Sequence, residues 1–134
     1  MRCAFLFERL SFLHMQPTLR NFRRALQAKS TPARAKVSQS FFRTGPGEYG
    51  EGDVFIGVTV PDTRLIVRQF AELPFADIRR LLQSKVHEER LAALLLLVHL
   101  FEKGIVAEQK KIVKFYLTHL ESVDNWDLVD LSAD

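Results

Sequence analysis

The segment VDNWDLVD, residues 123–130, places an indole and three carboxylates in one short stretch of chain. Trp126 and Asp130 stand four residues apart, so a helix that begins near Asp124 brings the indole and the carboxylate to one face. An aromatic face beside a carboxylate suits a cationic ligand, because the ring and the charge both attract it. A structural role stays open for Asp124 as an N-cap and for Asp127 in the first turn. Asp130 lies beyond the first turn, so capping and the helix dipole explain this carboxylate less well.

The segment GPGEYG, residues 45–50, matches the letters of the dinucleotide fingerprint G-x-G-x-x-G. The true motif follows a strand and opens a helix, whose amides meet the pyrophosphate. Here a predicted helix precedes the glycines, and Glu48 and Glu51 would repel phosphate. We therefore interpret this segment as an irregular loop and predict no nucleotide cofactor.

The sequence contains no complete motif for a metal site or for a catalytic thiol. His87 and the glutamate after it begin like the zinc motif H-E-x-x-H, but the second ligand position is Leu91. His99 lies within an apolar run, which favours a core histidine. Cys3 has no companion with a catalytic signature, and one cysteine forms no internal disulfide. Four histidines show no ligand spacing: His14, His87, His99 and His119. The sequence predicts neither a metal nor another cofactor.

Basic residues recur at helical spacing in three places. These are Arg20, Arg23 and Arg24; Arg64 and Arg68; and Lys110, Lys111 and Lys114. Nine of the nineteen Lys and Arg residues precede residue 44, together with only one of the sixteen acids. Each cluster is either a solvated helix face or part of a phosphate-binding track, and the second requires that several line one concave surface.

Apolar periodicity and proline positions predict a mostly helical chain. The expected helices span 17–28, 32–43, 61–71, 74–83, 86–103 and 107–121, and one more begins near Asp124. Residues 91–101 are apolar except His99, so this helix must be covered on several sides. The next helix has a single stripe of Ile112, Phe115, Tyr116 and Leu120. Residues 54–60 have strand propensity, but nothing else in the chain is expected to pair with them. We therefore favour an ordered connector or the start of a helix.

Stacked helical pairs of this kind indicate an all-α fold, either a HEAT-like α-solenoid or an ordinary helical bundle. The chain has 134 residues, 47% hydrophobic and 26% charged, with a net charge of +3. Its longest apolar run, residues 91–98, is far shorter than the about 20 residues of a membrane span. We therefore expect no membrane-spanning helix, and the single cysteine suits a cytoplasmic location.

Three segments in order carry a resemblance to a known family: residues 47–64 (GEYGEGDVFIGVTVPDTR), 87–98 (HEERLAALLLLV) and 125–134 (NWDLVDLSAD). Together they resemble the AlkD-type DNA alkylation repair proteins, which are alkylpurine DNA glycosylases built from HEAT-like repeats. The resemblance implies duplex DNA containing alkylated purines as the partner, a monomer, and no cofactor. Family members extend well beyond the last of these segments, so we expect a HEAT-like domain over residues 15–134 that is incomplete at its C-terminus. Residues 1–14 are expected to be an extension outside the family.

The resemblance assigns the damaged-nucleotide site to Trp126 and Asp130. It also suggests that the loop contacts the DNA backbone near the lesion through Tyr49, and that Arg64 is either a structural or a phosphate-facing residue. Neither is expected to be catalytic. Alkylation at N3 or N7 makes the purine cationic and a good leaving group, and Asp130 would stabilise the oxocarbenium character of the sugar. Two other functions stay open: a non-catalytic HEAT-like module that binds DNA structure, and an α-solenoid that binds a protein partner.

Overall fold

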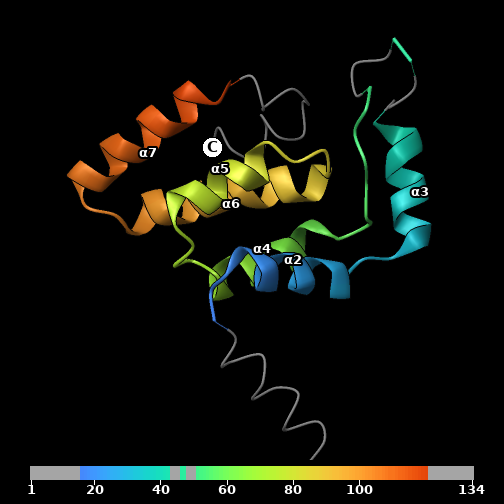
Figure 1. Ribbon diagram of the computed structural model, residues 1–134, viewed down its shortest axis with the longest axis horizontal. Helices are drawn as coiled ribbons and strands as arrows, with labels where there is room; N and C mark the ends of the chain where they lie inside the picture. Colours follow the sequence, from blue (N-terminus) through green and yellow to red (C-terminus); the bar gives the residue numbers. More distant parts are fainter. Residues whose placement is uncertain (1–15, 43–45, 48–50, 121–134) are drawn as a thin grey trace, which may run out of the picture.

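The computed structural model describes residues 16–42, 46–47 and 51–120, and these residues form six helices (Figure 1). The helices are α2 (Leu19–Ala28), α3 (Pro32–Phe41), α4 (Val60–Gln69), α5 (Phe75–Leu82), α6 (His87–Lys103) and α7 (Val106–Thr118). No strand occurs within the described ranges. The structure therefore confirms the predicted all-α fold.

The long helix α6 lies at the centre of the molecule. Helices α4, α5 and α7 all pack against it, and α2 packs against α4. Figure 1 shows α2 and α4 on one side of α6 and α7 on the other, while α3 stands apart beside an extended connector. Successive helices thus form stacked layers, an arrangement consistent with a helical-repeat solenoid.

Helix α6 has buried residues all around its axis, as its apolar sequence predicts. Every residue from Leu91 to Leu97 is buried, and they join one core with apolar residues of α2, α4 and α5. In the outer layer Phe22 of α2 meets Phe70, just after α4, edge to face with ring centroids 5.4 Å apart. The core is therefore continuous from α2 to α7.

Local signals explain where the helices begin. The hydroxyl of Thr18 accepts a hydrogen bond from the Asn21 amide, and Thr59 accepts one from Asp62 in the same way. Pro32 lies in the first turn of α3, where a missing N–H costs nothing. Each helix begins within two residues of its predicted start.

Three sequence expectations need correction or refinement. Residues 54–59 form an extended connector as favoured, but Val54 does pair, through one parallel bridge to Val86. In the predicted α7 stripe, Ile112 is buried and Phe115 and Tyr116 pack against the core, whereas Leu120 is 47% exposed because it lies beyond the helix end. His99 is only partly buried.

Candidate functional site

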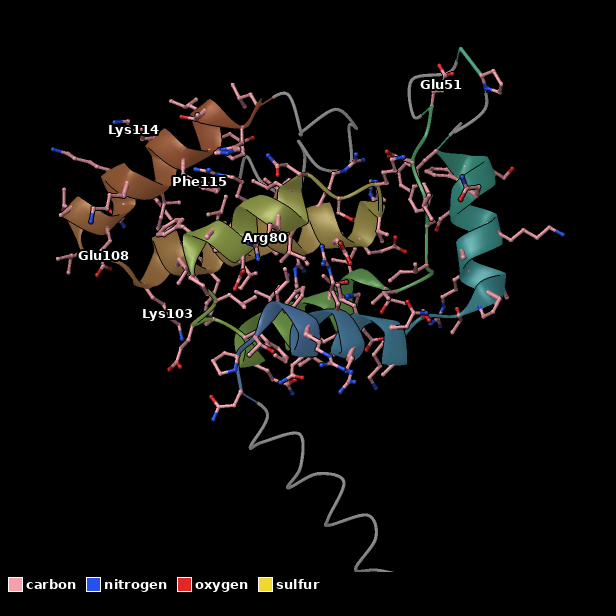
Figure 2. All side chains as sticks on the ribbon, viewed as in Figure 1. Glu51, Arg80, Lys103, Glu108, Lys114 and Phe115 are labelled. Carbon is pink, nitrogen blue, oxygen red and sulfur yellow. The ribbon has the colours of Figure 1, made fainter. Side chains whose placement is uncertain are left out.

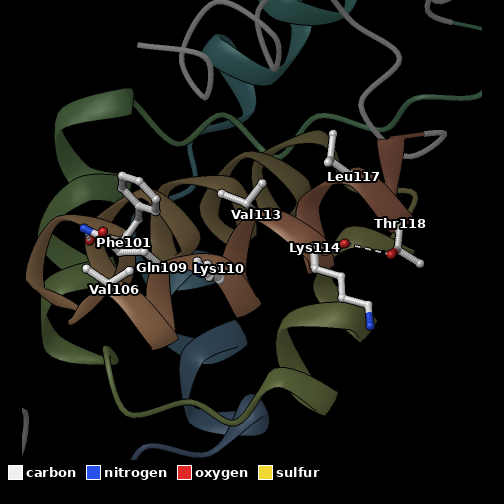
Figure 3. A pocket seen from close by; sticks show the side chains of 8 residues that line it. All are labelled: Phe101, Val106, Gln109, Lys110, Val113, Lys114, Leu117 and Thr118. Atoms are coloured by element: carbon white, nitrogen blue, oxygen red, sulfur yellow. Dashed lines mark hydrogen bonds between the residues drawn. The ribbon is translucent and has the colours of Figure 1, made fainter.

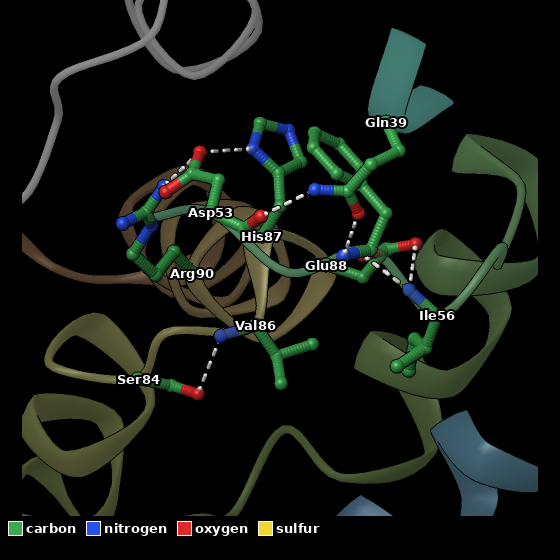
Figure 4. Close-up of polar contacts among 9 residues, drawn as sticks. Gln39, Asp53, Ile56, Ser84, Val86, His87, Glu88 and Arg90 are labelled. Atoms are coloured by element: carbon green, nitrogen blue, oxygen red, sulfur yellow. Dashed lines mark hydrogen bonds and ion pairs between the residues drawn. The ribbon is translucent and has the colours of Figure 1, made fainter. Parts of the chain in front are cut away.

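The described chain buries a charged cluster where the connector meets the start of α6 (Figure 4). The Nη2 of Arg90 lies 2.7 Å from both carboxylate oxygens of Asp53. The Nδ1 of His87 lies 3.4 Å from Oδ2 of the same carboxylate. All three residues are buried, so these contacts replace the water that the charges lose. The cluster fixes one end of the connector to the first turn of α6.

Glu88 holds the middle of the connector. Its carboxylate accepts hydrogen bonds from the backbone amides of Ile56, Gly57 and Val58, with N···O distances of 2.7–3.2 Å. Glu88 is itself only 3% exposed. Three consecutive amides converging on one carboxylate form an anion-binding concavity that the protein fills with its own side chain. The connector is thereby held in one conformation.

The connector also fits closely against the start of α3. Gly57 has a φ of +79°, and a Cβ at this position would lie 2.1 Å from the carbonyl oxygen of Thr31. The Thr31 amide donates to the backbone carbonyl oxygen of Gly57 at 3.1 Å. Near the other end of α3, the Gln39 side chain donates to the backbone carbonyl oxygen of Asp53 at 2.8 Å. Only glycine permits both the backbone conformation and the approach.

Stacked rings line a cleft beside this junction. Phe55 stacks on Phe42 with centroids 5.2 Å apart and on His87 with centroids 4.6 Å apart. The cleft has a volume of about 430 Å³ and lies between α3, the connector and the first turns of α4 and α6. Its walls are mostly apolar, and Arg34 of α3 contributes a positive charge. The junction therefore offers a preformed hollow that the surrounding hydrogen bonds keep rigid.

The predicted catalytic pair, Trp126 and Asp130, lies outside the described residues, as does Tyr49. Their roles stay predictions. Arg64 and Arg68 are exposed on α4. They share one face of that helix by their spacing, so the structure leaves both free to meet a phosphate.

The three predicted lysines lie on a different helix from these arginines. Lys110, Lys111 and Lys114 are all exposed on α7. Figure 3 shows Lys110 and Lys114 beside apolar Val113 and Leu117, in a shallow hollow along α7. Figure 2 shows Lys114 on α7, and Figure 1 shows α4 on the opposite side of α6 from α7. The described structure does not gather the α7 lysines and the α4 arginines into one track.

The arginines of α2 lie in a second shallow groove. Arg20, Arg23 and Arg24 line it together with residues of the connector and of the α6 start. Arg23 donates from Nε to Glu89 at 3.1 Å. The helical spacing correctly predicts that these arginines share a face.

The histidines take separate roles. His119 lies 2.7 Å from the Phe115 carbonyl through Nδ1 and stacks on its ring, whereas His87 belongs to the buried cluster. Among the residues that the structure describes, no three His, Cys, Asp or Glu side chains come close enough to bind one metal ion. Within the same residues, no helix has the length and apolarity needed to cross a membrane.

The buried contacts of Asp53, Glu88 and Arg90 were not predicted from the sequence. The pair His87-Glu88 drew attention only as an incomplete zinc motif. A signal was nevertheless present, because charged residues directly precede a long apolar run, and a charge at the start of a buried helix needs a partner. The sequence does not show which residue of the connector supplies that partner.

Comparison with protein families places the chain. A family described as DNA alkylation repair enzyme matches residues 22–134, a range that includes Trp126 and Asp130. The chain therefore belongs to the DNA alkylation repair enzyme family, which confirms the resemblance found from its three segments. Comparisons with curated proteins and with solved structures find no match.

Proposed function

We propose that this protein is a DNA glycosylase that removes cationic N3- or N7-alkylated purines from duplex DNA. The observation that carries the proposal is the family match over residues 22–134, which spans the Trp126–Asp130 pair. Activity in the cytoplasm as a monomer belongs to the same proposal.

The chemistry requires little from the protein beyond electrostatics. Water attacks C1′ of the deoxyribose while the C1′–N9 bond breaks. The electron pair of the broken bond goes to the purine and neutralises its positive charge. The proton of the attacking water passes to solvent. Asp130 stabilises the positive charge that develops on the sugar and positions the water, and Trp126 packs against the sugar and the cationic base. The alkylated purine is already a good leaving group, so this route needs no metal.

The decisive experiment measures base release from duplex DNA that contains 7-methylguanine. Asp130→Asn keeps the shape of the side chain and removes its charge, so it should abolish excision and leave duplex binding largely intact. Asp134→Asn is a matched control, because it removes the same charge outside the W-D-x-x-D motif. Undiminished excision by Asp130→Asn would refute the proposed role of this carboxylate.

The second candidate is a non-catalytic module that binds DNA through basic faces. The exposed Arg64 and Arg68, together with the α2 arginines, favour it as an alternative. Such a protein would bind duplex DNA with a steep salt dependence and release no base. A protein-binding solenoid would show no salt-dependent DNA binding at all.

A further inference from the structure

The arginines of α2 line a groove whose shape and charge suit a polyanion. The groove has a volume of about 670 Å³ and lies between α2, the connector and the start of α6. Helix α2 contributes the three arginines and Gln27, and residues 16–42 contain no acid. Three arginines against a single acid, Glu89, make this hollow basic.

One acid enters the groove, and it orients an arginine without neutralising the site. Glu89 accepts from Nε of Arg23, which leaves the two Nη groups of that guanidinium available to a ligand. The Glu89 side chain is 12% exposed and that of Arg23 is 43% exposed. Arg20 and Arg24 are exposed and form no ion pair with another described residue. The lining therefore keeps an excess of two positive charges.

The floor of the groove is apolar and supports the arginine stems. Leu19, Ile56 and Val86 supply it, and aliphatic stems can lie along such a surface while their charged ends reach solvent. At spacings of three and four residues the stems start about 5–6 Å apart on the helix. Guanidinium groups arranged in this way suit successive phosphates, each of which they can bind in a bidentate manner.

The groove and the ring-lined cleft lie on opposite sides of the connector. Ile56 faces the groove, whereas its neighbours Phe55 and Gly57 face the cleft, as expected for alternate residues of an extended chain. Likewise Glu88 belongs to the cleft and Glu89 to the groove. A ligand in the groove would therefore not enter the cleft, although the two lie next to each other along the connector.

We propose that this groove binds the phosphodiester backbone of duplex DNA flanking the lesion, through Arg20, Arg23 and Arg24. The proposal rests on the proposed function only in that the substrate is duplex DNA. It adds a contact surface to the predicted residues on α4 and α7. The proposed chemistry uses Trp126 and Asp130, so we expect the three arginines of the groove to contribute to DNA affinity.

The test compares two double variants that lose equal charge. Arg20→Gln with Arg24→Gln removes the unpaired arginines of the groove, and Arg79→Gln with Arg80→Gln removes two exposed arginines of α5. Fluorescence anisotropy with an unmodified duplex gives Kd over a range of salt concentrations. The groove variant should lose about 1.8 from the slope of log K against log salt, about 0.9 for each phosphate contact. The control variant should keep the wild-type slope.

An unchanged slope in the groove variant, or an equal loss in the control, would overturn the proposal. Vesicles of phosphatidylglycerol and phosphatidylcholine form a second arm, and a loss of vesicle binding without a loss of DNA binding would also overturn it. Circular dichroism melting of both variants checks that they remain folded. If the wild type binds DNA but releases no base, the glycosylase proposal fails while the slopes still decide the role of the groove.

Discussion

The two ends of α6 are built in opposite ways. At its first turn, His87, Glu88 and Arg90 are buried and hold the connector through hydrogen bonds and an ion pair. At its other end the helix leads into α7, where Val113 is 45% and Leu117 58% exposed along a shallow hollow. One end is thus held by buried polar contacts. The polar contact at the other end is exposed: the Gln109 side chain donates a hydrogen bond to the Phe101 carbonyl oxygen at 3.0 Å.

This difference shows where the described fold is sensitive to change. A buried charge that loses its partner keeps its full desolvation cost, so a single deletion at the first end is expensive. An exposed apolar side chain has little burial to lose, so a deletion on the outer face of α7 is nearly free. The connector end is therefore the place where geometry is set most precisely. The following predictions test this contrast, beginning with the largest effect.

Asp53→Ala should lower the free energy of unfolding by about 3–5 kcal/mol, because it leaves the Arg90 guanidinium buried without its carboxylate. Urea denaturation at neutral pH measures the change. Asp77→Ala is the control, since its partner Arg80 is 68% exposed and lies 3.6 Å away. That variant should lose no more than about 1 kcal/mol. Equal losses in the two variants would show that the buried pair has no special role.

Gly57→Ala should cost about 3 kcal/mol, because alanine is strained at a φ of +79° and its Cβ meets the Thr31 carbonyl. Gly52→Ala provides a matched control, with a φ of +85° and open space around the added Cβ. It should cost about 1 kcal/mol from backbone strain alone. The same denaturation experiment measures both. If both variants lost the same free energy, the close approach of the connector to α3 would not contribute.

Glu88→Gln should cost about 1.5–3 kcal/mol, because a neutral amide replaces the charged acceptor of three connector N–H groups. Hydrogen exchange should also become faster at the amides of Ile56, Gly57 and Val58, which local opening exposes. Glu108→Gln is the control, since Glu108 accepts only from the exposed Ile105 amide at 3.3 Å. Unchanged protection of the connector amides in Glu88→Gln would contradict the assigned role.

Leu117→Ala should change the free energy of unfolding by less than about 0.5 kcal/mol, because the side chain is already largely exposed. Ile112 lies on the same helix and is only 6% exposed, so Ile112→Ala should cost about 2–5 kcal/mol. Thermal unfolding of the two variants compares the faces of α7. A large loss from Leu117→Ala would mean that the outer face is covered in solution.

Much of the fold follows from local sequence. Thr18 and Thr59 cap helices whose starts proline and apolar periodicity also indicate, so the predicted and observed starts agree closely. The run from residue 91 to 97 demands cover on several sides, and α4, α5 and α7 supply it. The three family-like segments identify the repair family. These features depend on neighbours in the chain, and the sequence therefore determines them by itself.

Only the tertiary structure decides which distant residues share a site. Asp53 and Arg90 are 37 residues apart, and Glu88 reaches an amide 31 residues earlier. Helical spacing places the α2 arginines on one face, but Ile56 and Val86 make that face a groove only through packing. The sequence indicates which charges and which apolar faces need partners. The partners are selected when α6, the connector and α3 pack together, because burial makes an unpaired charge costly whatever its distance along the chain.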